Sequence, residues 1–154
     1  MKFMWHYDTP IGRLGIGETD GAISRILFEG QTDEGYESRE TEVIKAAAQE
    51  LYEYFAGERK IFDMPLVPEG TPFQKSCWNA LMAIPYAETR SYKDIAGAVG
   101  NPKGFRAVGM ANNRNPIPIV VPCHRVVGSD GSLIGFGGGL PTKQFLLDLE
   151  KENV

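Results

Sequence analysis

A proline-interrupted apolar run followed by a glycine-rich stretch most constrains how this chain can fold. Pro116, Pro118 and Pro122 exclude a long helix from this region, because proline lacks the amide hydrogen that a helix interior requires. The run is therefore predicted to be an extended, stiffened segment that holds Cys123 in a fixed place. Residues 128–139 contain six glycines and predict a loop that lets the backbone approach a flat ligand closely.

The sequence before this run predicts two lobes. Alternating apolar residues in the first thirty positions predict a small antiparallel meander, and residues 29–40 predict a surface loop. Apolar residues at helical spacing predict a helix over residues 41–56 that covers the sheet. Proline and glycine in residues 64–70 predict a linker. The expected fold class is α+β (α/β in two lobes), with an N-terminal sheet-and-helix lobe at residues 1–68 and a mostly helical lobe at residues 69–154.

The second lobe carries helix signals in quick succession. A capping box at Thr71 starts the first helix, whose apolar spacing makes Cys77 a buried packing residue. A second helix starts at Ser91, and a third is predicted from Asn101 to about Asn113. These two form a helix-turn-helix candidate, although such pairs are commonly just packing units. A last helix is predicted over residues 141–152, with its inward side formed by Phe145, Leu146 and Leu149.

Charge is divided unevenly between the two lobes. The whole chain of 154 residues has a net charge of −4, which by itself argues against nucleic acid as a partner. Residues 1–70 hold 7 lysines and arginines against 14 acids, whereas residues 71–154 hold 9 against 6. One stretch is more basic still, with Asp94 as its only acid: Arg90, Lys93, Lys103, Arg106, Arg114 and Arg125. It predicts either a phosphate-binding face or a solvated surface of mixed charge.

Only two cysteines occur, Cys77 and Cys123, and neither belongs to a paired metal-ligand or disulfide pattern. We expect reduced thiols, no metal and no cofactor. No apolar stretch is long enough to cross a membrane, and the first residues lack the features of a secretory signal. The expected location is therefore the cytoplasm.

Cys123 and His124 together suggest a held nucleophile with a base nearby. A thiol needs a base or a positive environment to supply thiolate at neutral pH. Neighbours on an extended strand point to opposite faces, so adjacency alone leaves a purely structural pair as the alternative.

The motif around these residues adds a resemblance. Pro122-Cys123-His124-Arg125-Val126-Val127, the preceding Asn115-Pro116-Ile117-Pro118-Ile119 and the following Gly135-Phe136-Gly137-Gly138-Gly139-Leu140 resemble the O6-alkylguanine-DNA alkyltransferases, also called methylated-DNA-protein-cysteine methyltransferases. The resemblance runs from about Thr71 to Glu150. It implies DNA repair by stoichiometric, irreversible alkyl transfer from O6-alkylguanine to the protein's own cysteine, with O4-alkylthymine as a second candidate substrate.

The resemblance also implies a role for particular residues. Cys123 would attack the alkyl carbon, His124 would deprotonate the thiol through a bound water, and Glu150 would orient the histidine. Asn115 matches an asparagine that joins the recognition helix to the active-site segment.

Further matches concern the DNA and the pocket. Tyr92 would push the 3′ phosphate and protonate guanine N3, while Arg106 would replace the flipped base in the stack. Small residues of the same helix, Ala107 among them, fit a close approach to the minor groove. The pocket would be completed by the Cys123 carbonyl and by Val126, Phe136, Gly137 and Lys143; for Lys143, solvent exposure is the alternative. Arg114 stands where many relatives have glycine, and either contacts a phosphate or is simply exposed.

The implied partner is double-stranded DNA containing O6-alkylguanine, bound by a monomer. Two other classes of protein remain. A non-enzymatic damage sensor of the same fold carries tryptophan at the cysteine position, which Cys123 argues against. A Cys-His hydrolase would turn over many times, whereas the implied reaction stops after one event.

Overall fold

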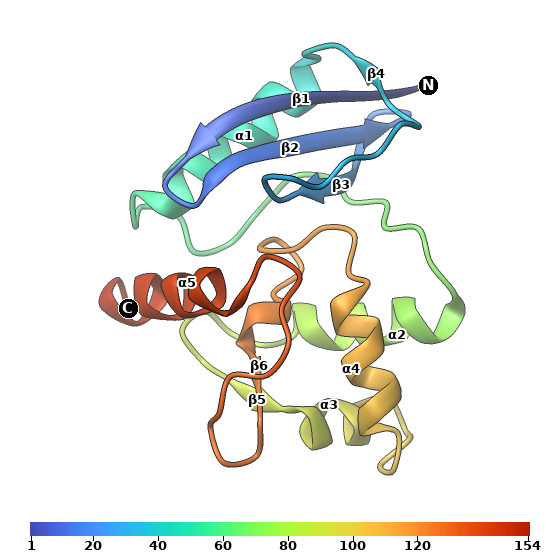
Figure 1. The fold of residues 1–154 in the computed structure, drawn as a ribbon, viewed down its shortest axis with the longest axis vertical. Coiled ribbons are helices and arrows are strands. Elements are labelled where there is room, and N and C mark those ends of the chain that lie inside the picture. The colour runs from blue at the N-terminus through green and yellow to red at the C-terminus, as the bar shows by residue number, and fades with distance from the viewer. The chain divides into compact units, whose positions relative to one another are not determined.

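The computed structural model describes residues 1–154, which divide into two compact units, Met1–Glu69 and Gly70–Val154 (Figure 1). The structure confirms the α+β class expected from the sequence, with sheet and helix in the first unit and mainly helix in the second.

The first unit is built on a four-stranded sheet in the order β3-β2-β1-β4. The strands are β1 (Lys2–Thr9), β2 (Gly12–Thr19), β3 (Ala22–Leu27) and β4 (Glu37–Ser38). The first three are antiparallel, as the alternation of apolar residues predicts. β4 pairs parallel with β1, so the prediction of a plain loop over residues 29–40 was wrong at this point. A strand of two residues is too short to leave a periodic pattern in the sequence.

Helix α1 (Glu42–Phe55) packs on this sheet and closes the core of the first unit (Figure 1). Its N-cap Thr41 accepts a hydrogen bond from the Ile44 amide, and Gly57 follows its end with a φ of 77°. The buried side chains of α1 are Ile44, Ala47, Ala48, Leu51, Tyr54 and Phe55. The predicted helix over residues 41–56 is therefore confirmed to within its caps.

The segment predicted as a linker pairs with the sheet edge before it leaves the first unit. The Ile23 amide donates to the Pro65 carbonyl at 2.8 Å, and the Val67 amide donates to the Ile23 carbonyl at 2.8 Å. Proline keeps its carbonyl acceptor although it lacks a donor, so Pro65 can receive a bond at an open edge.

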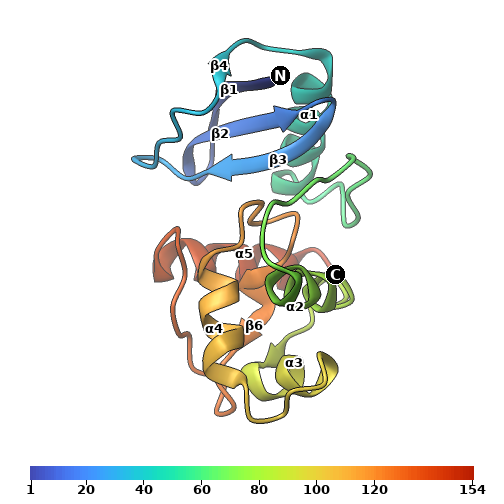
Figure 2. The same ribbon diagram turned by 90° about the vertical axis from the view of Figure 1, so that its right-hand side faces the viewer.

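The second unit gathers three short helices that pack on one another, and a longer one at its end (Figure 2). They are α2 (Pro72–Met82), α3 (Tyr92–Ala98), α4 (Phe105–Asn113) and α5 (Leu140–Glu152). Capping boxes start α2 at Thr71 and α3 at Ser91, as predicted. Cys77 is fully buried in α2, which is also as predicted.

Two helix predictions in this unit were wrong in detail. Helix α4 begins at Phe105 rather than at Asn101, because the Gly104 amide closes a turn on the Asn101 carbonyl at 2.8 Å. On α5 the buried side chains are Lys143, Leu146 and Glu150, whereas Phe145 is 39 % exposed. The apolar-stripe rule favours phenylalanine over a lysine and a glutamate at buried positions, and here it is overridden by polar groups that find partners inside.

The proline-interrupted run is not extended, contrary to the prediction. The Val121 amide donates back to the Ile117 carbonyl at 2.9 Å, and Ile119 between them has a φ of 75°. A β-branched residue in the left-handed region is strained and persists only where its surroundings fix it. The run is a tight buried turn that leads directly into a single 3₁₀ turn over Cys123–Arg125.

A two-stranded parallel ladder, which the sequence did not predict, follows this turn. It joins β5 (Arg90–Ser91) to β6 (Val126–Val127), with Arg90 opposite Val126. The ladder places the start of α3 beside the residues that follow Cys123.

Candidate active site

The position of Cys123 is set by the turn before it rather than by a strand. The Asn115 side chain donates from Nδ2 to the Val121 carbonyl at 2.8 Å, and its Oδ1 accepts from the Ile117 amide at 3.0 Å. One side chain thus fixes both ends of the doubled-back segment. Cys123 lies immediately after it with 6 % of its surface exposed.

The surroundings of Cys123 keep its sulfur protonated. Burial raises the pKa of the Cys123 thiol to about 11, against the opposing effects of the Asn115 side chain and the positive charge of Lys143. A thiol of this kind reacts as a nucleophile only when a base takes its proton.

His124, fully buried next to Cys123, is bound to Glu150 of α5. The distance between His124 Nε2 and Glu150 Oε2 is 2.6 Å. A carboxylate only accepts hydrogen bonds, so Nε2 carries the hydrogen and Nδ1 carries the lone pair. Nδ1 is buried and has no hydrogen-bond partner in the protein. Burial lowers the pKa of His124 below its ordinary value, so the imidazole is neutral and can accept a proton at Nδ1.

Arg125 belongs to the basic stretch that predicted either a phosphate-binding face or a solvated surface, and both alternatives are wrong for this residue because it is buried. The residue is 7 % exposed, and its side chain forms two hydrogen bonds to Glu150, from Nε at 2.8 Å and from Nη2 at 3.0 Å. Sequence position cannot reveal this, because Glu150 lies 25 residues away along the chain. Hydrogen bonds from His124 and Arg125 outweigh the effect of burial and hold the pKa of Glu150 well below its ordinary range.

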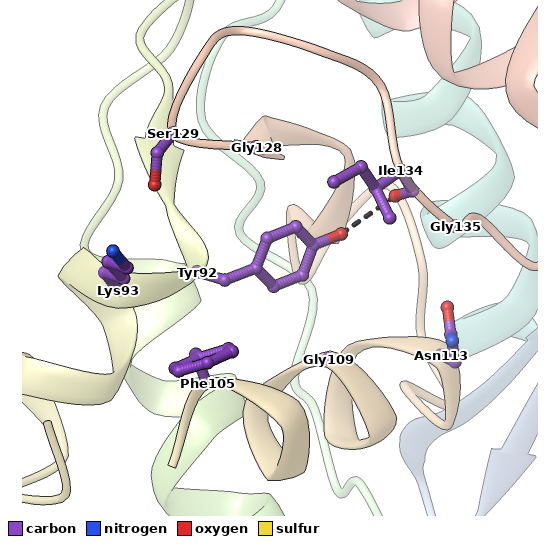
Figure 3. A pocket seen from close by; sticks show the side chains of 9 residues that line it. All are labelled: Tyr92, Lys93, Phe105, Gly109, Asn113, Gly128, Ser129, Ile134 and Gly135. Atoms are coloured by element: carbon purple, nitrogen blue, oxygen red, sulfur yellow. Dashed lines mark hydrogen bonds between the residues drawn. The ribbon is translucent and has the colours of Figure 1, made fainter. Parts of the chain in front are cut away.

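A pocket of about 320 Å³ opens within the second unit (Figure 3). Its lining residues are Tyr92, Lys93, Phe105, Gly109, Asn113, Gly128, Ser129, Ile134 and Gly135. Tyr92 points across it and donates from its hydroxyl to the Ile134 carbonyl at 2.8 Å. Burial raises the pKa of Tyr92, and a thiolate at Cys123 would raise it further. Cys123 itself is not among the lining residues.

Of the residues singled out from the sequence as site residues, only Tyr92 lines this pocket. The sequence did not predict that Phe105 forms an aromatic wall of the pocket. It also did not predict that Gly109 and Asn113 line the pocket together with Phe105. These three recur every four residues on α4, so helical spacing would have revealed them.

Lys143 is fully buried, so its predicted place inside the site is favoured over the solvent-exposed alternative. Its Nζ donates to the Val126 carbonyl at 2.6 Å and to the Ile134 carbonyl at 3.1 Å. The Val126 amide donates to the Cys123 carbonyl. Lys143 therefore joins α5, the strand after the cysteine turn and the glycine-rich loop, and burial lowers its pKa.

The remaining predicted residues lie outside this polar cluster. Arg106 and Ala107 are exposed on α4, and Arg114 is exposed at its C-cap. Phe136 and Gly137 lie in the glycine-rich loop, outside the pocket lining. The structure thus brings together Cys123, His124, Glu150, Asn115, Val126 and Lys143, with Tyr92 on the pocket side.

No three or more histidine, cysteine, aspartate or glutamate side chains are grouped so that they could hold a metal ion. None of the helices combines the length and the apolar character needed to cross a membrane.

Comparison with known proteins accounts for nearly the whole chain. Residues 72–152 match the family described as 6-O-methylguanine DNA methyltransferase, DNA binding domain. Residues 4–68 match the family described as 6-O-methylguanine DNA methyltransferase, ribonuclease-like domain.

Relatives and solved structures agree with these matches. The constitutive methylated-DNA–protein-cysteine methyltransferase of Bacillus subtilis is 49 % identical over 98 % of this chain and 96 % of its own. That of Methanosarcina acetivorans is 48 % identical over 94 % and 95 %. The crystal structure of Mycobacterium tuberculosis O6-methylguanine methyltransferase has a TM-score of 0.92 and 42 % identity, covering 100 % of this chain and 95 % of its own. A structure of the M. tuberculosis protein in complex with DNA has a TM-score of 0.91 and 44 % identity, over 96 % and 92 %. The chain therefore belongs to the 6-O-methylguanine DNA methyltransferase family.

Proposed function

We propose that this protein repairs O6-alkylguanine in double-stranded DNA by moving the alkyl group, once and irreversibly, onto the sulfur of Cys123. The observation that carries the proposal is the buried contact of 2.6 Å between His124 and Glu150 directly behind the cysteine turn. It gives Cys123 a neutral base whose orientation is fixed by an acid, which is the arrangement of nucleophile, base and orienting group.

In the proposed reaction the Cys123 proton passes to His124 Nδ1 through a bridging water. The thiolate sulfur forms a bond to the alkyl carbon while the bond from that carbon to guanine O6 breaks, and the electron pair moves onto the guanine. Tyr92 donates a proton to guanine N3, so the proton taken from the thiol balances the one given to the leaving base. The product is S-alkylcysteine, and no step restores the thiol.

The damaged base must leave the duplex to reach the sulfur, at a cost of roughly a few kcal/mol. The pocket supports this proposal because its walls are the flat or small groups that a purine ring needs, including Tyr92, Phe105 and Gly109. Arg106 and Ala107 on the exposed side of α4 would face the DNA, with Arg106 filling the gap in the base stack. Arg114, exposed at the end of the same helix, would contact a phosphate.

The test is incubation with duplex DNA containing O6-methylguanine, followed by intact-mass analysis. We expect the protein to gain one methyl group, mapped to Cys123, and Cys123→Ser to gain none. Cys77→Ala is the matched control and should react like the wild type, since Cys77 lies in the packed core of α2. Binding without any gain of mass would indicate a damage sensor, and many turnovers per molecule would indicate a hydrolase; either result contradicts the proposal.

A second experiment tests how the protein engages DNA. Arg106→Ala should reduce transfer from duplex DNA much more than transfer from free O6-benzylguanine, because only the duplex has a stack to refill. Arg13→Ala, an exposed arginine of β2, serves as the control for loss of positive charge. Equal losses on both substrates for Arg106→Ala would refute its assignment.

Two finer expectations belong to this proposal: that the protein acts as a monomer and that it works in the cytoplasm. Sedimentation analysis of the free protein tests the first, and cell fractionation tests the second.

A further inference from the structure

Arg125 is bound on several sides, although the proposed chemistry gives it no task. Besides its two bonds to Glu150, it donates from Nη1 to the Ile84 carbonyl at 2.8 Å. Its guanidinium carbon lies 5.6 Å from the centre of the Tyr86 ring. Because this arginine is held firmly and has 7 % of its surface exposed, it can fix the position and influence the charge of the groups that it contacts.

Arg125 occupies acceptor positions on both oxygens of Glu150. Oε1 accepts from Arg125 Nε and from the Ala87 amide at 3.1 Å, while Oε2 accepts from His124 Nε2 and from Arg125 Nη2. The carboxylate cannot rotate without losing one of these bonds. The fork-shaped contact of the guanidinium therefore sets the plane in which His124 must meet Oε2.

The charge of Arg125 matters as much as its shape. A buried carboxylate beside a lone histidine attracts a proton to the imidazole, because the resulting ion pair is strong in a medium of low dielectric constant. A protonated His124 would have no lone pair to offer to Cys123. Arg125 weakens this attraction because its charge opposes that of Glu150.

All the titratable groups around His124 act together. Helix α5 contributes Glu150 and Lys143, and the cysteine turn contributes Cys123 and Arg125. Tyr86 faces the pair formed by Arg125 and Glu150. Burial is the largest effect that favours a neutral ring, and the charges of Arg125 and Lys143 act in the same direction, against the charge of Glu150.

We propose that Arg125 is a positioning residue that keeps His124 neutral, with its Nδ1 free, by engaging both oxygens of Glu150. The electrostatic part of this inference stands on the buried cluster alone. Its benefit to alkyl transfer rests on the proposed function.

Histidine NMR tests the electrostatic part without any substrate. The chain has two histidines, His6 and His124, so imidazole nitrogen signals can be assigned with a single His6→Gln variant. In the wild type we expect His124 to be the neutral tautomer with hydrogen on Nε2 at about pH 8 and to remain so at the ordinary histidine pKa of about 6.5. In Arg125→Met the pKa of His124 should rise by about 1 unit or more. Arg125→Lys should leave it near the wild-type value, and Arg13→Met is the control for loss of a remote arginine.

Kinetics tests the benefit to the reaction. The rate of single-turnover transfer from O6-methylguanine duplex DNA is measured from pH 5 to pH 9. In Arg125→Met the fall of this rate on the acidic side should begin at a higher pH than in the wild type, by the same amount as the rise in the His124 pKa. Below that pH the rate should fall about tenfold per unit of this rise. A purely structural role would instead lower the rate evenly at every pH.

Each result bears on the inference. A charged His124 at pH 6.5 in the wild type overturns it, and so does an unchanged His124 pKa in folded Arg125→Met. If Arg125→Met does not fold, Arg125→Gln takes its place, because it removes the charge and keeps a hydrogen-bond donor; an unchanged His124 pKa in that variant overturns the inference. A wild type that shows the expected NMR behaviour but transfers no alkyl group refutes the proposed function and leaves the electrostatic inference standing.

Discussion

Glu150→Gln should destabilise the second unit severely, although the two side chains have nearly the same shape. Glu150 is fully buried and accepts four hydrogen bonds, from His124, from the Ala87 amide and twice from Arg125. Glutamine removes the negative charge that balances Arg125. It also replaces one of the two carboxylate oxygens by an NH₂ group, which cannot accept the hydrogen bonds that this oxygen receives. Removing one partner of a buried ion pair costs about 3–5 kcal/mol, because the other charge stays buried without compensation.

The free energy of unfolding, from urea titrations followed by Trp78 fluorescence, measures this loss. Trp78 is buried in α2 of the same unit and is bonded through Nε1 to the Ala111 carbonyl. Glu152→Gln is the matched control, since Glu152 lies on the same helix and is exposed. A loss below about 1 kcal/mol for Glu150→Gln would show that the ion pair is not the closed, dry cluster that the structure describes.

The same carboxylate makes stability depend on pH in a defined direction. The pKa of Glu150 is lower in the folded protein than its ordinary value of 4.5, so its contribution is fully present above that value. It is lost as the pH falls below about 4.5 toward the folded-state pKa. Glu150→Gln should therefore have a flatter stability profile than the wild type between about pH 5 and pH 3.

Three further substitutions have expected outcomes. Lys143→Met removes both bonds from Nζ and should speed amide hydrogen exchange in residues 128–139 by about tenfold or more, measured by mass spectrometry; unchanged exchange would contradict the anchoring role. Tyr92→Phe keeps the ring but removes the proton donor, so single-turnover transfer from duplex DNA should fall about a hundredfold, and a wild-type rate would exclude the hydroxyl from the reaction. Trp78→Phe loses the buried bond to Ala111 and should lower the free energy of unfolding by about 1–2 kcal/mol in urea titrations followed by circular dichroism, whereas no change would mean that this bond contributes nothing.

The sequence predicted best the features that depend on near neighbours. The capping boxes at Thr71 and Ser91 each join a cap residue to a partner three residues later. The sequence pattern therefore contains everything that the hydrogen bonds need. The burial of Cys77 followed from helical spacing in the same way.

Features that depend on distant partners were missed or misjudged. The proline-interrupted run doubles back because Asn115 binds both of its ends, whereas proline content alone suggested an extended segment. Arg125 looks like one more surface cation until Glu150 is placed beside it. The pocket likewise combines α3, α4 and the glycine-rich loop, which no periodic pattern within one element can reveal.

The two hydrogen bonds of the Asn115 side chain allow almost no other residue type at this position. The side chain must donate a hydrogen bond to the Val121 carbonyl and accept one from the Ile117 amide. A single methylene group joins the carboxamide to the backbone, so the reach of the side chain is fixed. Aspartate has no hydrogen to give, serine has one oxygen for two widely spaced tasks, and glutamine is one carbon too long. The reactive sulfur thus owes its location to one carboxamide, and a family-wide census of this site should find little besides asparagine.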